Sequence, residues 1–237
     1  MPSTRGIERF GGILLILMLV TSVSGAVFAG AVGTDYNVPA DEVADVLQLV
    51  AGNQGLHQAE IGFDLATFVI LVALSGALYL AFSPHNRLLA LLGTLGLAAG
   101  GIILTVHDVF WFAFPSVAID FVSASGSRVE VLLEIGRVTM LTANWGLSVG
   151  ITFMGLGILA YGVLMIWSGA VPRGLGWLGA VAGVLLFTGT WLPRIDVGLY
   201  AAWTALAAPV LLWELGLGLW LLIKGTNQAG ELALRHP

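Results

Sequence analysis

The chain has 237 residues, of which 58% are hydrophobic and 10% are charged, with a formal net charge of -5 and no cysteine. Soluble domains carry charges on about a quarter of their residues, so this composition excludes a soluble fold. The lack of cysteine excludes disulfides, thiolate metal ligands and a cysteine nucleophile, and the negative charge gives no basis for nucleic-acid binding.

The apolar segments predict an all-α polytopic membrane helical bundle of about six transmembrane helices, in a single integral membrane domain over residues 1–237. A helix needs about 20 apolar residues to cross a bilayer, and such spans with short connections use up this chain. The first span, residues 11–32, ends in small residues and therefore also fits a cleaved signal peptide. The length of its apolar run favours a retained helix.

A polar excursion on the outer side, residues 34–56, follows the first span. Within it, Val43, Val46, Leu47 and Val50 are spaced i, i+3, i+4 and i+7, which predicts a short surface helix with one apolar face. The second outer excursion is expected at residues 115–127, and a helical lead-in from Arg128 precedes the fourth span. The remaining spans are expected at residues 66–82, 88–112, 145–167, 175–192 and 197–223.

The positive residues favour a cell-membrane protein with both termini in the cytoplasm. In that orientation three arginines lie outside, Arg128, Arg137 and Arg194, and the other Lys and Arg residues lie inside, in accord with the positive-inside rule. Tryptophans are expected to anchor the helices at both membrane boundaries. The outer set is Trp111, Trp145 and Trp191, and the inner set is Trp167, Trp177 and Trp220.

Glu214 is the most informative single residue. It precedes Lys224 by about 15 Å of helix and is therefore expected near the midplane of the bilayer. An ionisable group at that depth must face a partner or water. Pro209 is expected to kink the same helix and to free the carbonyl of Ala205. Two interpretations stay open, a functional carboxyl in a small polar cavity and a structural one bonded to a neighbouring helix.

A second group of candidates forms a polar layer at the outer ends of three helices. One helical face carries His57, Glu60 and Asp64, and His107 and Asp108 end the third span. A further face carries Glu130, Glu134, Arg137 and Asn144. The histidines and carboxylates would suit a transition metal ion or, between His57 and His107, a haem. No cofactor is expected, because no spacing here is a recognised ligand motif, and a solvated rim explains the same residues.

The C-terminal half resembles a known family. Residues 172–179, PRGLGWLG, resemble its PRWLGWLG turn, and residues 209–225 resemble its closing signature of Pro, Glu, Trp-Leu and Lys-Gly in that order. The family is that of polytopic membrane proteins catalogued as domain of unknown function 4386. The resemblance is strongest over residues 134–227, and it departs from the family at residues 98–101, where relatives often carry an Arg and a Glu. The resemblance implies a six-helix membrane fold. It does not suggest any particular activity, because the function of the family is itself unassigned.

Three hypotheses about function follow. The first is a non-enzymatic membrane protein that binds, transports or senses a small ligand through the outer polar layer and Glu214. The alternative is a structural or accessory subunit of a larger membrane complex, associating with itself or with other subunits through small-residue pairs such as Gly96 and Gly100. The third is an intramembrane metal-dependent or haem-binding protein. In each case the lipid bilayer is the one partner that the composition requires.

Overall fold

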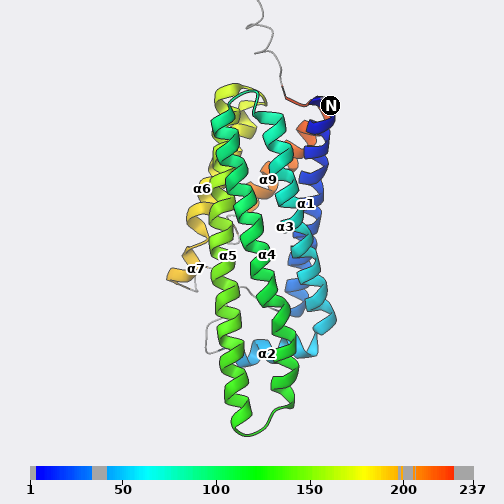
Figure 1. The fold of residues 1–237 in the computed structure, drawn as a ribbon, viewed down its shortest axis with the longest axis vertical. Helices are drawn as coiled ribbons and strands as arrows, with labels where there is room; N and C mark the ends of the chain where they lie inside the picture. Colours follow the sequence, from blue (N-terminus) through cyan, green and yellow to red (C-terminus); the bar gives the residue numbers. More distant parts are fainter. Residues whose placement is uncertain (1–3, 34–41, 197–198, 200–204, 206, 227–237) are drawn as a thin grey trace, which may run out of the picture.

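Six helices form a closed ring in the computed structural model, which describes residues 4–33, 42–196, 199, 205 and 207–226. The ring helices are α1 (Thr4–Val32), α3 (Gln54–Phe82), α4 (Arg87–Ser123), α5 (Ser127–Ser168), α6 (Arg173–Gly189) and α9 (Ala208–Ile223). Each packs against the next in that order, and α9 closes the ring against α1. Figure 1 shows the resulting elongated bundle. The described residues contain no β-strand, so the all-α prediction is confirmed.

The bundle has two distinct ends (Figure 1). We call the end that holds Arg5 and Thr226 the termini end, and the end that holds the α4–α5 connection the hairpin end. Four helices, α1, α3, α4 and α5, are long and apolar enough to cross a membrane. By contrast, α6 and α9 have 17 and 16 residues, and most of the chain between α7 (Leu192–Ile195) and α9 lies outside the described residues. The count of about six spans therefore remains a prediction.

Helices α4 and α5 are longer than a membrane is thick. They have 37 and 42 residues, which correspond to about 55 and 63 Å, against about 30 Å for the hydrocarbon core of a bilayer. Most of the segment expected as an outer excursion, residues 115–127, is helical, because α4 continues through Pro115 to Ser123; its place outside the membrane stays a prediction. Burial of Phe114, Pro115 and Ala118 against neighbouring helices offsets the backbone hydrogen bond that the proline removes.

Helix α2 (Val43–Gly52) lies across the bundle near the hairpin end (Figure 1). It buries Val43, Val46, Leu47 and Val50, the four positions predicted for its apolar face. These side chains belong to a compact apolar cluster with residues of the long helices, among them Trp111, Phe114 and Met140. The segment expected as a surface helix therefore closes a small core of its own at the hairpin end.

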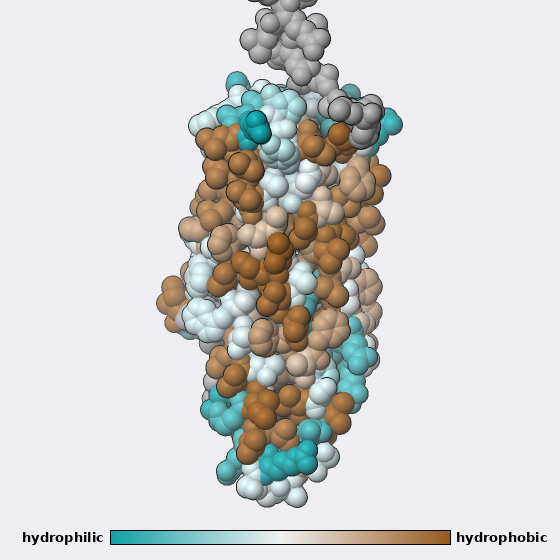
Figure 2. Space-filling view, in the orientation of Figure 1, coloured by the Kyte–Doolittle hydropathy of each residue, from teal (hydrophilic) through white to brown (hydrophobic). Residues whose placement is uncertain are grey.

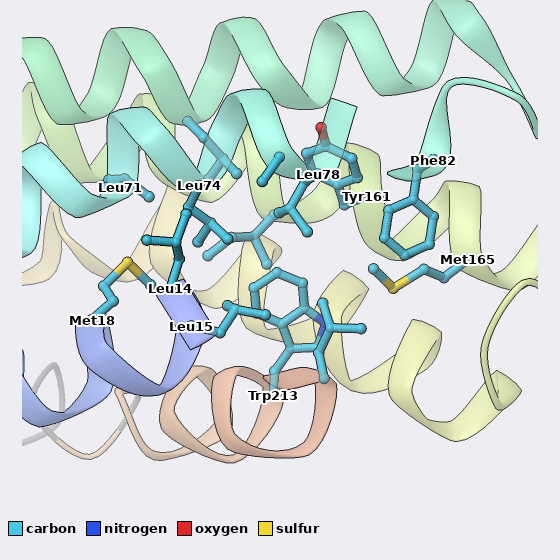
Figure 3. Packing of buried hydrophobic residues seen from close by; sticks show 14 of the residues in the cluster. Leu14, Leu15, Met18, Leu71, Leu74, Leu78, Phe82, Tyr161, Met165 and Trp213 are labelled. Atoms are coloured by element: carbon cyan, nitrogen blue, oxygen red, sulfur yellow. The ribbon is translucent and has the colours of Figure 1, made fainter. Parts of the chain in front are cut away.

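A larger apolar core fills the ring toward the termini end. Figure 3 shows Leu15 of α1, Leu78 of α3 and Tyr161 of α5 in one cluster with Trp213 of α9. Glycines bring the helix backbones into direct contact around it. A Cβ atom at Gly96 of α4 would lie 2.6 Å from the backbone nitrogen of Gly157 on α5, which no real side chain tolerates. The small-residue pairs therefore serve packing within one chain.

The two ends of the described chain are joined at the termini end. Glu8 is buried, and its Oε1 accepts from the backbone N–H of Thr226 at 3.1 Å and also from the Thr226 hydroxyl. Arg5 donates to the carbonyl of Lys224, beyond the last turn of α9. Gly225 has φ +76, and a Cβ there would overlap with Glu8 and Arg5. The glycine of the family-like Lys-Gly signature is thus required by backbone conformation and by space.

Candidate functional site

A cavity of about 230 Å³ lies at the centre of the helix ring. Every ring helix contributes to its lining, and most of the lining is apolar, including Phe68, Leu104 and Ile151. Met18 and Leu71, which Figure 3 labels in the large apolar core, also line the cavity, so the two adjoin each other. The polar exceptions are Ser22, Asp64, Thr67 and Glu214. The cavity therefore combines an apolar wall with two carboxyl groups and two hydroxyls.

Glu214 faces this cavity from α9 and is 5% exposed. This burial agrees with the prediction that Glu214 faces the interior of the bundle, whereas the hydrogen-bonding partner also predicted for it is not found among the described residues. Pro209 lies in the first turn of α9, which begins at Ala208. The predicted kink, with its free Ala205 carbonyl, concerns a segment that lies mostly outside the described residues, so it stays a prediction. Within the described part of the chain, no residue forms a hydrogen bond or ion pair with Glu214.

Asp64 approaches the cavity from α3, on the side of α1. Gly25 of α1 makes room for it, since a Cβ at that glycine would overlap with Asp64 Oδ1. One helical turn further along α3, the hydroxyl of Thr67 lies 2.7 Å from the hydroxyl of Thr21 on α1. Asp64 therefore belongs to the cavity, together with Glu214, and not to the polar layer in which the sequence placed it.

His57 and Glu60 form a buried pair near the start of α3. His57 Nδ1 lies 2.9 Å from Glu60 Oε2, and both residues are 0% exposed. Trp111 of α4 donates from its indole Nε1 to Glu60 Oε1 at 3.3 Å, and its ring lies edge-on to His57. Trp111 is itself 1% exposed, so its expected role as a boundary anchor is wrong. We define the polar cluster as a group of buried polar side chains from α3, α4 and α5. Its members are His57, Glu60, His107, Asp108, Trp111, Asn144 and Ser148.

The second half of the polar cluster comes from α4 and α5. His107 Nδ1 lies 3.2 Å from Asp108 Oδ1, and both side chains are buried. Asn144 and Ser148 of α5 are also buried, and the backbone of α5 approaches His107 closely at Gly146. Two imidazole–carboxylate pairs therefore lie buried between three helices, beside the apolar cluster that α2 completes.

The other members of the expected polar layer lie elsewhere. Glu130 and Glu134 are exposed, and Arg137 donates to Glu134 Oε1 at 2.9 Å on the same helix. This pair matches the solvated-rim interpretation of the sequence. Among the described residues, no three His, Asp or Glu side chains are placed to hold a metal ion together. The set proposed for a metal, His57, Glu60, Asp64, His107 and Asp108, is therefore divided between the polar cluster and the cavity.

Sequence reasoning missed several contributors, among them Thr67 and Trp111. Thr67 continues the α3 face of His57, Glu60 and Asp64 by one more turn, so the helical spacing carried its signal. Trp111 gave no such signal, because a tryptophan at a predicted helix end fits a membrane boundary equally well. Its role as a donor to Glu60 depends on how α3 and α4 pack, which the sequence does not contain.

Comparison with known proteins places the chain in a family without assigning a role to any residue. No curated protein and no solved structure matches it. The matching region includes most of α1, the polar cluster, the cavity and the Lys-Gly that follows α9, and it is longer than the stretch over which the family-like motifs occur. The chain belongs to the family described as Domain of unknown function (DUF4386), whose model matches residues 10–225.

Proposed function

We propose that this protein binds a small organic cation with an apolar body inside the membrane, in the cavity that Glu214 and Asp64 line. One observation carries the proposal: Glu214 is buried at a cavity and has no hydrogen-bonding partner among the described residues. A carboxyl group at membrane depth is costly unless it meets a polar partner, and such groups commonly mark substrate or ion pathways. A bound ammonium group would supply that partner.

The lining supports a cation in preference to an anion. Its ionisable residues are both acidic, and no Lys, Arg or His is among its lining residues within the described part of the chain. Its apolar wall suits a hydrocarbon group. At about 230 Å³ the cavity is smaller than the range of about 300–1,000 Å³ typical of drug-sized ligands, so the ligand is expected to be compact.

The proposal is for binding coupled to transport or sensing, with no catalysis. Among the described lining residues, no histidine lies beside the hydroxyls of Ser22 and Thr67, and the proposal assigns the carboxyl groups of Asp64 and Glu214 to the bound cation. The orientation with both termini in the cytoplasm is part of the same proposal. In that orientation the hairpin end faces outward and the polar cluster lies on the outer side of the cavity.

Ligand-dependent stabilisation of the purified protein tests the proposal. The thermal unfolding midpoint would be measured in detergent with a series of small alkylamines, and with the alcohols and carboxylic acids of matched chain length. Because a ligand that binds only the folded state raises its stability, amines are expected to raise the midpoint and the matched alcohols and acids are not.

Three variants identify the site. Glu214→Gln keeps the shape of the side chain but removes its charge, and is expected to abolish the amine-dependent rise. Asp64→Asn is expected to reduce it. Glu134→Gln makes the same chemical change on the exposed surface and is expected to respond like the natural protein. An amine response that survives Glu214→Gln, or no response to any amine in the natural protein, would contradict the proposal.

A further inference from the structure

A line of polar side chains runs along one face of α3, from the start of the helix to the central cavity. Its successive members are separated by four and three residues in alternation, which keeps them on one face of the helix. The line ends at the cavity, because the next position on that face is Leu71, which belongs to the large apolar core. We call this line the α3 polar stripe, and its members are Asn53, His57, Glu60, Asp64 and Thr67.

The α3 polar stripe connects the surface with the cavity through the polar cluster. Asn53 directly precedes the helix, is half-buried, and accepts from the backbone N–H of His57 at 3.0 Å. His57 and Glu60 belong to the polar cluster, and Asp64 and Thr67 line the cavity. The whole stripe covers about 21 Å of helix, and its steps are about 4.5 to 6 Å. A single water molecule can bridge such a step between two polar groups.

The polar cluster covers the cavity on its hairpin-end side. On α3, Glu60 lies one helical turn closer to the hairpin end than Asp64, which lines the cavity. On α4, Asp108 lies one turn closer to that end than Leu104, which also lines the cavity. α5 shows the same relation at Asn144. Three helices therefore place buried polar side chains between the cavity and the hairpin end.

The outer end of the α3 polar stripe lies beside an open depression in the surface. The depression has a volume of about 600 Å³ and is lined by Gln48, Ala51 and Gly52, together with two residues of α4. Gly52 directly precedes Asn53, the first residue of the stripe. Figure 2 shows hydrophilic patches in the hairpin-end half of the bundle, the half in which α3 begins (Figure 1). Solvent therefore reaches the start of the stripe.

The two imidazole–carboxylate pairs of the polar cluster each keep a polar atom for a further proton or partner. His57 is bonded to Glu60 through Nδ1, and its buried Nε2 has no hydrogen-bonding partner among the described residues. Asp108 is bonded to His107 through Oδ1, and its buried Oδ2 likewise has no such partner there. A purely structural buried pair is expected to have its remaining polar atoms satisfied. Chains of His, Asp and Glu inside a membrane are typical of proton relays.

The other charged groups on the surrounding helices lie away from the α3 polar stripe. α1 has no charged or titratable residue over the range 10–33. Asp45 of α2 is exposed, and Arg137 of α5 is bonded to the exposed Glu134. From α6 and α9, Glu214 is the charged residue that lines the cavity within the described chain. The carboxyl groups of the cavity are therefore continuous with the polar cluster and with no other set of titratable groups.

We propose that the α3 polar stripe is a proton pathway between the hairpin-end surface and the central cavity, and that the cavity exchanges a proton for the cation it binds. The exchange rests on the proposed cation binding. In the empty cavity the partnerless carboxyl of Glu214 holds a proton, because an uncompensated charge at membrane depth is costly. A bound ammonium ion takes the place of that proton, so the charge in the cavity does not change. The released proton passes by way of Asp64, Glu60 and His57 to the surface at Asn53.

Proton release on binding tests the exchange with the natural protein. The protein in weakly buffered detergent solution would be mixed with each alkylamine of the series used above, and released protons would be followed with a pH indicator. Alkylamines are fully protonated near neutral pH, so any released proton comes from the protein. One proton per bound amine is expected, with an apparent affinity that rises about tenfold per pH unit.

The outcomes separate the exchange from cation binding itself. Amines that raise the unfolding midpoint but release no proton would overturn the exchange and leave the proposed cation binding intact. Amines that change neither the midpoint nor the pH would overturn both.

Two pairs of matched variants test the pathway. Glu60→Gln and His57→Gln remove a proton-carrying group and keep a polar side chain of similar size. By stopped-flow mixing, each is expected to release the proton about a hundredfold more slowly, the low end of what a positioned proton-transfer group contributes. The controls are Glu134→Gln on the exposed surface of α5 and His85→Gln in the α3–α4 turn, and both are expected to release it at the natural rate.

The number of protons released and the amine-dependent rise in the midpoint distinguish a slowed pathway from a damaged fold. Both are equilibrium quantities, so they are expected to be unchanged in Glu60→Gln and His57→Gln, with unchanged helical content by circular dichroism. The two variants interrupt the stripe at different points, so either one carries the test if the other does not fold. A natural rate of release in a folded variant of either kind, or equal slowing in the controls, would overturn the pathway.

Discussion

The indole N–H of Trp111 on α4 donates to Glu60 on α3, and the same carboxylate is held on its other oxygen by His57. The contact joins two helices through a fully buried charge-bearing group. An acceptor that loses its donor in such a site is left with an uncompensated desolvation cost. Trp111 therefore stabilises the contact between α3 and α4 through this hydrogen bond as well as through packing.

Trp111→Phe is expected to lower the free energy of unfolding by about 1–3 kcal/mol, because it keeps the aromatic ring and removes the donor. The measurement is thermal or denaturant unfolding in detergent. Trp177→Phe serves as the control, since Trp177 is 61% exposed, and it is expected to change stability little. Equal stability of the Trp111 variant and the natural protein would show that Glu60 obtains its hydrogen bonds elsewhere.

Gly157→Ala is expected to destabilise the α4–α5 contact. A Cβ at this position would lie 2.6 Å from the backbone nitrogen of Leu97 and 2.8 Å from the carbonyl of Gly93, so the two helices must move apart. Gly62→Ala is the matched control, because nothing lies near a Cβ there. The control is expected to be neutral or stabilising by up to about 1 kcal/mol through helix propensity. The two unfolding midpoints would be compared under identical conditions.

Glu8→Ala is expected to lower the free energy of unfolding by about 1–3 kcal/mol, since it removes a buried acceptor and leaves the backbone N–H of Thr226 unpaired. Gly225→Ala is expected to act in the same direction, through the strain of its positive φ and through overlap with Glu8. Arg9→Gln is the control on the exposed side of the same helix. Stability would be followed by thermal unfolding in detergent.

Glu214→Leu is expected to leave the protein as stable as before, or more stable, and to abolish the response to amines. The residue is buried and has no hydrogen bond within the described chain, so a leucine of similar size removes an uncompensated polar group. Loss of function with gain of stability is typical of residues retained for binding. A clear loss of stability would instead identify Glu214 as a structural hydrogen-bonding residue.

The two ends of the bundle are expected to lie on opposite sides of the membrane. Ser125→Cys lies in the connection at the hairpin end and Pro84→Cys in the α3–α4 turn at the termini end, and both positions are exposed. In intact cells, a membrane-impermeant maleimide is expected to label Ser125→Cys and not Pro84→Cys. Labelling of Pro84→Cys alone would reverse the predicted orientation, and labelling of both would contradict it.

Features that depend only on the spacing of residues along one helix could be predicted from the sequence. The apolar face of α2 follows helical spacing, and the inward direction of Glu214 follows from the cost of exposing a carboxyl group to lipid. The helical lead-in before residue 145 was likewise visible, and α5 begins at Ser127.

Features that depend on how helices meet could not be predicted. A proline is a reasonable end for a predicted helix, yet Pro115 lies inside α4 because its neighbours are buried. Asp64 and Glu60 share one face of α3, but a difference of one helical turn assigns them to different surroundings. The cavity itself needs every ring helix in place, so no single segment of sequence carries its signature.

The closure of the ring by α9 against α1 has a consequence for biogenesis. Glu8 is synthesised well before its partner Thr226, from which it is separated by 218 positions. During synthesis the buried face of α1 therefore remains uncovered until α9 has been made. Neither the contact between α1 and α9 nor the central cavity can form before that, so chains truncated before α9 are expected to be targets for membrane proteases.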